Sequence, residues 1–398
     1  MQIKDITAKI ISDSRGKPTV EVKLKTDKGI FTADSPSGTS KGRYEAVEID
    51  VKKAVYNVRE IIAPKLLQKQ WQSQKQVDGL LIELAGSNKK NMGSNAVLPV
   101  SVAVCRAFSD ANNLPLYSYI AKLSNYSEPT VLPKPCVLLI EGGKHGKNKL
   151  DVQEFMAIGC FSSFKENYKA MVQVYQALEK VLRDELGKDG IQQGLEAGFA
   201  PSINKTEQAL SFIMQAIKRA SYDGKVKIGL DAAASEFYSQ GKYNFEGKLL
   251  SGRNLTVFYK KIADKYPILF IEDPFAEDDF KSWQSIKELR NKGVLIVGDD
   301  LTVTNLERIH RANKADLCNA IIIKPNQIGT VTETINAASK AKERGWKRIV
   351  SHRSGDTVDD FIADLAVGVG AEFIKSGGLY AKERKVKYNR LLAIEKEI

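Results

Sequence analysis

Six apolar, strand-like runs in the second half of the sequence each end in a chargeable side chain. In chain order, these side chains are Asp231, Glu272, Asp299, Lys324, His352 and Lys375. The first two are 41 residues apart, and the later intervals of 23 to 28 residues each fit one strand, one helix and two loops. The strands of an α/β barrel direct their carboxyl ends to one face. The spacing therefore predicts that three acids, two lysines and a histidine share a pocket.

This set of side chains indicates a particular chemistry. Three carboxylates at close range repel one another unless a cation lies between them, and oxygen ligands favour Mg²⁺ over zinc. A lysine beside such an ion has its ammonium form disfavoured and can act as a base. A lysine that stays charged, together with Arg353, suits a substrate with carboxylate or phosphate groups. The pattern predicts proton abstraction next to a carboxylate, with the charge of the enolate held by the metal.

Two further acids precede this array. Glu154 lies in Gln153–Met156, which closes a possible strand, and Glu196 lies among the glycines of Gly194–Gly198. A protonated carboxylic acid at either position could donate a proton to a leaving hydroxyl group. Taken singly, each acid is equally compatible with an ordinary surface glutamate.

Two loops are candidates for lids that close over a charged substrate. One is Ser37–Ser40, and the other is the glycine-rich, basic segment Glu141–Gly146, which contains His145. The second loop does not fit the pattern of a phosphate-binding P-loop. No GxGxxG motif opens a helix, which argues against a nicotinamide cofactor.

The elements around these residues fall into two parts. Residues 19–25 alternate apolar and polar side chains, and a turn at 27–29 leads into a second short strand, which predicts a hairpin. Helical patterns cover about residues 44–122, interrupted at 86–93. A proline-containing segment at 128–135 then precedes alternating strand-like and helical runs. We therefore predict an α/β protein with a small N-terminal α+β domain (1–128) and a C-terminal α/β barrel (129–398).

Composition narrows the possible classes of function. The chain has 60 Lys plus Arg against 48 Asp plus Glu, a net charge of +12, but no basic motif with interleaved aromatic residues, so nucleic-acid binding is not favoured. Four widely spaced cysteines and three histidines argue against a disulfide framework and a structural zinc site. The lack of a signal peptide and of a long apolar run predicts a soluble, cytoplasmic protein with no membrane association.

Motifs along almost the whole chain resemble those of the enolase family. These motifs are Asp13–Gly16, Pro36–Gly38, Gly142–His145, Gln153–Met156, Gly198–Pro201, Ala233–Tyr238, Ile271–Asp279, Gly298–Asn305, Ser351–Gly355 and Ile374–Gly377. Their order and spacing carry the resemblance. It implies an eight-stranded C-terminal barrel and the Mg²⁺-dependent, reversible dehydration of 2-phosphoglycerate to phosphoenolpyruvate in glycolysis and gluconeogenesis.

The resemblance also implies roles for individual residues. Asp231, Glu272 and Asp299 match the ligands of a tightly held Mg²⁺, and Ser40 matches a ligand of a second Mg²⁺ that binds with the substrate. The remaining matches are Lys324 as the base at C2, Glu196 with neighbouring Glu154 as the acid for the C3 hydroxyl, Lys375 for the substrate carboxylate, Arg353 and Ser354 for the phosphate, and His145, Gln153 and His352 as other pocket residues.

Several positions depart from the family pattern. Glu141 stands where the family usually has Asn, and Leu195 stands where it usually has an acid. Ala197 replaces a glycine, and Lys41 replaces a threonine. The effect of these changes on activity is open. None of them removes a group with an implied chemical role.

The family's usual dimer contact is also altered. This contact pairs an arginine with a glutamate across the two subunits, and the matching residues here are Lys9 and Lys396, flanked by Glu395 and Glu397. Exposed ion pairs contribute only about 0–1 kcal/mol. We still expect a homodimer or a higher oligomer.

Two alternatives remain beside an active enolase. One is a paralogue that acts on another acid, because one scaffold and its metal site can serve several reactions. The other is a non-enzymatic binding or scaffold protein that uses its positive charge, and its nucleic-acid binding would depend strongly on salt.

Overall fold

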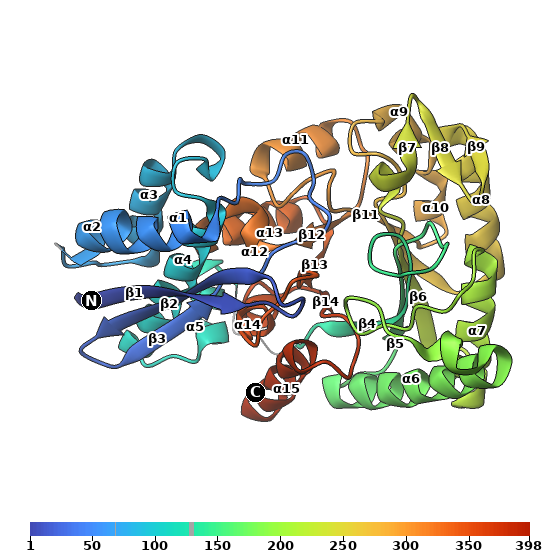
Figure 1. Cartoon of the computed structure of the whole chain (residues 1–398), viewed down its shortest axis with the longest axis horizontal. Helices are drawn as coiled ribbons and strands as arrows, with labels where there is room; N and C mark the ends of the chain where they lie inside the picture. Colours follow the sequence, from blue (N-terminus) through green and yellow to red (C-terminus); the bar gives the residue numbers. More distant parts are fainter. Residues whose placement is uncertain (68, 127–130) are drawn as a thin grey trace.

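The computed structural model describes residues 1–67, 69–126 and 131–398. It has a smaller N-terminal part beside a larger barrel (Figure 1). Part of the predicted boundary segment, residues 128–130, lies outside the described residues.

The chain begins with a three-stranded antiparallel sheet. Its strands, in spatial order, are β1 (Ile3–Ser12), β2 (Pro18–Thr26) and β3 (Ile30–Asp34). The pairing of β2 with β3 confirms the predicted hairpin. Val20, Val22 and Leu24 of β2 are fully buried, while the alternate residues Lys23 and Lys25 are exposed, as expected for a sheet with one face in water.

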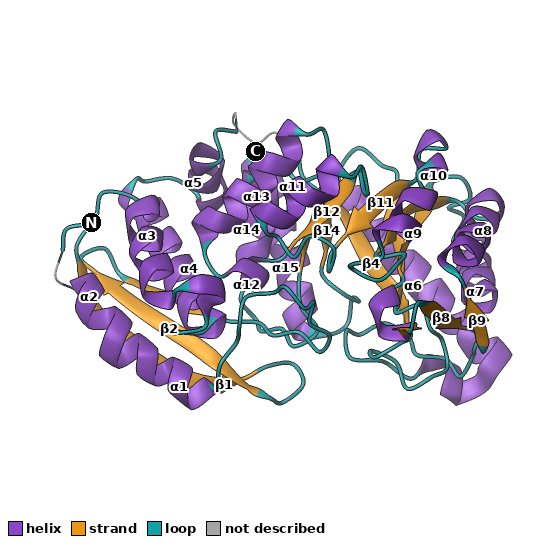
Figure 2. Cartoon of the chain, turned by 90° about the horizontal axis from the view of Figure 1, so that it is seen from above, coloured by secondary structure: helices purple, strands orange, loops and turns teal. Residues whose placement is uncertain are grey.

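Helices follow this sheet in the chain (Figure 2). The segments that contact the sheet are α1 (Val51–Tyr56), the π-helical segment η1 (Asn57–Ile62), α2 (Ala63–Leu67) and α4 (Ser94–Ala111). The others are α3 (Gln74–Ala85), the short η2 (Ser87–Lys89) and α5 (Leu116–Leu123). The helical pattern predicted from residue 44 starts only at Val51, because the carboxylate of Asp50 caps α1 by accepting the backbone N–H of Lys53. Helix α4 contacts the sheet and also α12 (Pro325–Ile328) of the barrel, so it joins the two parts.

Eight strands close the barrel, which confirms the predicted fold class. In spatial order they are β10 (Ile268–Glu272), β11 (Leu295–Gly298), β12 (Ala320–Ile323), β13 (Lys347–Ser351), β14 (Phe373–Lys375), β4 (Lys134–Glu141), β5 (Glu154–Gly159) and β6 (Val226–Asp231). All of the predicted strand-end side chains lie at or directly after the carboxyl end of a strand.

Strand β5 runs antiparallel to both of its neighbours, β4 and β6. The sequence interpretation that Glu154 closes a strand is therefore wrong, because Glu154 opens β5. The reversal has a simple consequence. The amino end of an antiparallel strand lies at the same barrel face as the carboxyl ends of the parallel strands, so Glu154 still reaches the predicted pocket.

Helices surround the barrel (Figure 1). They are α6 (Phe164–Leu186), α7 (Thr206–Arg219), α8 (Gly252–Lys265), α9 (Phe280–Ser285), α10 (Glu288–Asn291), α11 (Leu306–Lys314), α12 (Pro325–Ile328), α13 (Val331–Glu343), α14 (Phe361–Gly368) and α15 (Lys382–Glu397), with short η3 (Gly187–Ile191) and η4 (Ala234–Phe237). A small antiparallel sheet of β7 (Tyr238–Ser239), β8 (Lys242–Phe245) and β9 (Lys248–Leu250) precedes α8. This insertion explains why the first interval between strand ends is longer than the others.

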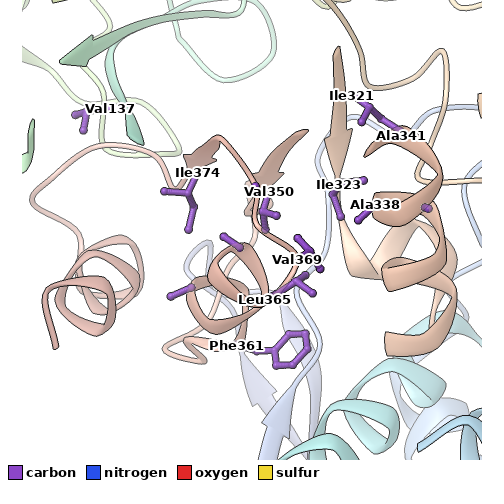
Figure 3. Packing of buried hydrophobic residues seen from close by; sticks show 14 of the residues in the cluster. Val137, Ile321, Ile323, Ala338, Ala341, Val350, Phe361, Leu365, Val369 and Ile374 are labelled. Atoms are coloured by element: carbon purple, nitrogen blue, oxygen red, sulfur yellow. The ribbon is translucent and has the colours of Figure 1, made fainter. Parts of the chain in front are cut away.

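The barrel strands bury both of their faces. In β12, Ile322 packs with the residues that fill the barrel interior. Its neighbours Ile321 and Ile323 point outward and face Ala338 and Ala341 of α13 (Figure 3). The alternation follows from the two-residue repeat of a strand, and it gives the pocket a rigid floor.

Gly229 of β6 provides a test of this packing. A Cβ atom at this position would lie 2.2 Å from Cζ of the fully buried Phe270. We expect Gly229→Ala to destabilise the protein by about 1–3 kcal/mol in urea unfolding, because the barrel interior has no room for it. Gly79→Ala is the matched control. Gly79 lies in α3 with nothing within 4 Å of its would-be Cβ, so alanine should stabilise by about 0.5–1 kcal/mol. Equal effects at the two sites would contradict this account.

Candidate active site

A cavity of about 410 Å³ opens at the carboxyl ends of the parallel barrel strands. Twelve of the thirteen predicted site residues line it, namely Ser40, His145, Gln153, Glu154, Glu196, Asp231, Asp299, Lys324, His352, Arg353, Ser354 and Lys375. The thirteenth, Glu272, is fully buried and contacts Lys375. The strand-end argument thus brings the predicted residues together, and their individual roles remain predictions.

Lys375, at the end of β14, lies among three carboxylates. Its Nζ is 2.9 Å from Glu272 Oε2, 3.0 Å from Asp231 Oδ2 and 3.2 Å from Glu154 Oε2. Burial lowers the pKa of Lys375, but the neighbouring carboxylates outweigh burial and hold the pKa well above its usual value. The ammonium group is therefore the cation that these acids share in the structure.

Lys324, directly after β12, forms an ion pair with Asp299, which follows β11. The other carboxylate oxygen of Asp299 accepts a 2.9 Å hydrogen bond from Gln327 Nε2. Burial lowers the pKa of Lys324, but the charge of Asp299 outweighs it, and the pKa is raised. The protein atoms alone therefore favour the ammonium form of Lys324, because the nearby carboxylate stabilises the charge. The expectation that a bound metal disfavours this form stays a prediction.

The acids around the two lysines fit a hard divalent cation. Burial and the charges of Asp231 and Asp299 raise the pKa of Glu272 well above its usual value. Glu272 Oε1 is buried and has no hydrogen-bond partner among the described residues. Ligand oxygens of Asp299 lie within 4.8 Å of those of Asp273 and Asp300, whereas the other two predicted ligands, Asp231 and Glu272, are not part of this group. A group of oxygen donors with excess negative charge is the ligand type that Mg²⁺ prefers.

A second buried cluster contains His145, Glu154 and Glu196. His145 Nδ1 lies 3.7 Å from Glu154 Oε1 and 3.6 Å from Glu196 Oε1, and burial lowers the pKa of His145. Burial raises the pKa of Glu154 to about 8. Burial alone would also raise the pKa of Glu196, but His352 and His145 outweigh it and hold that pKa well below its usual value. Burial therefore favours the protonated form of Glu154, and the histidines beside Glu196 favour its ionised form.

His352 is held in one orientation by two partners. Arg384 of α15 hydrogen-bonds to His352 Nδ1, and because a guanidinium group only donates, Nδ1 is the acceptor. His352 Nε2 then carries the hydrogen, and it lies 3.1 Å from Glu196 Oε2. Burial lowers the pKa of His352 to about 4, so the ring is neutral at neutral pH.

The N-terminal part contributes to the pocket through Glu45 and the predicted lid loop Ser37–Ser40. Arg353 Nη1 is 2.8 Å from Glu45 Oε2, and Arg353 Nη2 donates to the backbone oxygen of Ser40 at 3.0 Å. Ser354 Oγ accepts the backbone N–H of Thr39 at 2.7 Å. The loop therefore contacts the residues predicted to bind phosphate.

Gln153 is the last predicted site residue to be placed, and Lys41, Leu195 and Ala197 are positions that depart from the family pattern. Gln153 precedes β5, and its Oε1 is buried with no hydrogen-bond partner among the described residues. Lys41 turns to Glu48, 2.6 Å away, and Leu195 is 40% exposed, so neither lines the cavity. Ala197 adopts a left-handed backbone conformation (φ +65°), which explains why a glycine suits this position.

Sequence reasoning missed several residues that hold the site. Asp273 accepts the backbone N–H groups of Asp299 and Asp300 at 2.9 and 2.8 Å, and the doublet Glu272-Asp273 was a visible signal for it. Glu45 and Arg384 gave no local signal, because each acts on a residue more than thirty positions away. Only the fold brings them to the pocket.

The fold and the site together define an α/β-barrel enzyme in which buried acids and two lysines surround one cavity. Comparison with known families identifies the class further. A family profile described as "Enolase, C-terminal TIM barrel domain" matches residues 129–398, and one described as "Enolase, N-terminal domain" matches residues 3–120.

Curated relatives agree with these profiles. A protein named "Enolase" from Mastigamoeba balamuthi is 44% identical over 421 aligned positions, and one from Eimeria tenella is 43% identical over 427. Each alignment covers all of this chain and 96% of the relative. The chain belongs to the enolase family of lyases, and Mg²⁺ is the metal that this family implies.

Proposed function

We propose that the chain catalyses the reversible, Mg²⁺-dependent dehydration of 2-phosphoglycerate to phosphoenolpyruvate. The observation that carries the proposal is the placement of the predicted base and acids. Strands β12 and β5 are four positions apart in a ring of eight, so Lys324 and Glu154 stand on opposite walls of one cavity. Glu196 lies beside Glu154. A substrate between the walls would have its C2 proton facing the base and its C3 hydroxyl group facing the acid.

The acids on the lysine side of the cavity would hold the metal. In this proposal Asp231, Glu272 and Asp299 hold one Mg²⁺, and Ser40 helps hold a second that arrives with the substrate. When bound, the ions supply positive charge for the negative charge that develops on the substrate carboxylate. A bound metal would also neutralise the charge of Asp299, which now raises the pKa of Lys324. The neutral form of Lys324, which can accept a proton, would then be favoured.

The side chains then divide the remaining work. Lys375 binds the substrate carboxylate, and Arg353 and Ser354 bind the phosphate, with His145, Gln153 and His352 completing the pocket. Lys324 Nζ accepts the C2 proton. The electron pair of the broken C–H bond is first delocalised into the substrate carboxylate as an enolate. In a second step this pair forms the C2–C3 double bond as the C3–O bond breaks.

Glu196, with Glu154 beside it, transfers a proton to the departing hydroxyl group, and water leaves. The pKa of Glu196 is low in the substrate-free protein. The carboxylate and phosphate of the substrate add negative charge to the cavity, and this charge favours the protonated form of the acid.

Replacement of Lys324 tests the proposal. The intact protein should form phosphoenolpyruvate from 2-phosphoglycerate only when Mg²⁺ is present, and Lys324→Ala should lower kcat by about 10²–10⁴-fold because the base is lost. Lys314→Ala, at an exposed lysine on α11, should leave the rate unchanged. Absence of turnover in the intact protein would contradict the proposal.

The comparisons lend no support to a paralogue with another substrate or to a basic scaffold protein.

We propose that the protein forms a homodimer that lacks the arginine–glutamate ion pair usual between subunits in this family. Lys9 pairs with Glu21 of its own sheet at 3.1 Å. Glu395 accepts the backbone N–H groups at the start of α6, and Glu397 pairs with Arg390. Both acids that flank Lys396 therefore have partners within the subunit and are not free to compensate for the lost contact.

The double variant Lys9→Arg, Lys396→Glu should restore the cross-subunit pair. A symmetric dimer restores this pair twice, so in sedimentation equilibrium we expect the double variant to tighten the dimer by up to about thirtyfold at low salt, since each exposed pair contributes about 0–1 kcal/mol. The gain should disappear at high salt. A wild-type protein that stays monomeric at every concentration would contradict the proposed dimer.

We further propose a cytoplasmic protein with two domains, 1–128 and 129–398, that does not bind nucleic acid. Among the described residues, no helix combines the length and the apolar character that a bilayer span requires.

A further inference from the structure

Glu141, the last residue of β4, is a fully buried acid that the family resemblance does not predict, because related enolases usually have Asn there. Its carboxylate accepts two backbone N–H groups of the loop that carries the predicted proton donor. Glu141 Oε1 is 2.5 Å from the nitrogen of Gly198, and both carboxylate oxygens are 3.1 Å from the nitrogen of Glu196. The carboxylate of Glu141 thus binds the backbone of Glu196, the residue predicted to donate the proton.

The loop is built closely around this carboxylate. A Cβ atom at Gly194 would lie 2.4 Å from Glu141 Oε2, and one at Gly198 would lie 2.9 Å from Glu141 Cγ. On the other side, the backbone oxygen of Glu196 accepts the N–H of Gly378 at 2.8 Å. The backbone N–H and C=O groups of Glu196 are therefore both held by hydrogen bonds, and glycines make the close approach of Glu141 possible.

We infer that Glu141 is a positioning residue for Glu196: its buried carboxylate, held by the N–H groups of Glu196 and Gly198, fixes the loop so that the Glu196 side chain reaches the C3 hydroxyl group of the substrate. This role rests on the proposed function. Glu141 does not line the cavity and acts only through Glu196.

The role predicts a selective defect. Lys324 lies on the opposite wall and pairs with Asp299, and the structure as described shows no hydrogen bond or ion pair between Lys324 and Glu141, so removal of the C2 proton should not depend on this acid. Departure of the hydroxyl group does depend on the position of Glu196. Glu141→Gln keeps the size of the side chain but turns an NH₂ group toward a backbone N–H, which should displace the loop.

The test compares two reactions of the intact protein with Mg²⁺ and 2-phosphoglycerate. Exchange of the C2 proton with deuterated solvent, followed by NMR, reports the Lys324 step. Formation of phosphoenolpyruvate reports both steps. For Glu141→Gln we expect dehydration to fall by about tenfold or more, as small displacements of catalytic groups do, while exchange stays within about threefold of wild type.

Two further variants serve as a positive and a negative control. Glu196→Gln should show the same selective loss in stronger form. Glu395→Gln is the matched control, because Glu395 also accepts two backbone N–H groups, those of Phe164 and Lys165, but lies outside the cavity. It should leave both reactions unchanged.

Two outcomes would overturn the inference. Dehydration by Glu141→Gln at the wild-type rate would show that Glu196 needs no such support. Exchange and dehydration falling together would show that Glu141 serves only the stability of the fold. Absence of both reactions in the wild-type protein would instead overturn the proposed function, on which the role depends.

Discussion

Opposite charges buried together at the mouth of the barrel are the constraint on which the rest of the site depends. Asp231, Glu272 and Asp299 come from three adjacent strands, and the ammonium groups of Lys375 and Lys324 lie among them. Desolvation of these charges is costly unless each has a partner. The closed ring of strands holds the partners at fixed positions, and this rigidity makes the arrangement possible without a flexible, hydrated site.

The same constraint explains the supporting contacts. Charged side chains that face a cavity need partners on their other side to hold their orientation. Distant segments of the chain supply these partners. Glu45 of the N-terminal part holds Arg353, and Arg384 of the last helix holds His352. A barrel without its N-terminal part would thus lose the partner of a buried arginine. The two parts of the protein make one site, since each contributes charge that the other needs.

Much of this arrangement could be predicted from the sequence because strand ends repeat at nearly regular intervals. The strand-end pattern placed Asp231, Glu272 and Lys375 at one face of the barrel. It could not reveal the reversal of β5, since an antiparallel strand has the same apolar pattern as a parallel one. Nor could it reveal Glu141, whose carboxylate meets backbone groups more than fifty residues away. Contacts of this kind follow from the tertiary fold and leave no local pattern.

Lys375 occupies the place of a cation among the acids in the structure, and the proposed function requires it to leave Glu272 when metal and substrate bind. A crystal structure of the protein with Mg²⁺ and phosphoenolpyruvate tests it most directly. We predict metal density at Asp231, Glu272 and Asp299, with Lys375 Nζ beyond about 3.5 Å from Glu272 Oε2 and bound to the ligand carboxylate. A ligand-bound structure in which Lys375 still bridges Asp231 and Glu272, with no metal at these acids, would contradict the claim.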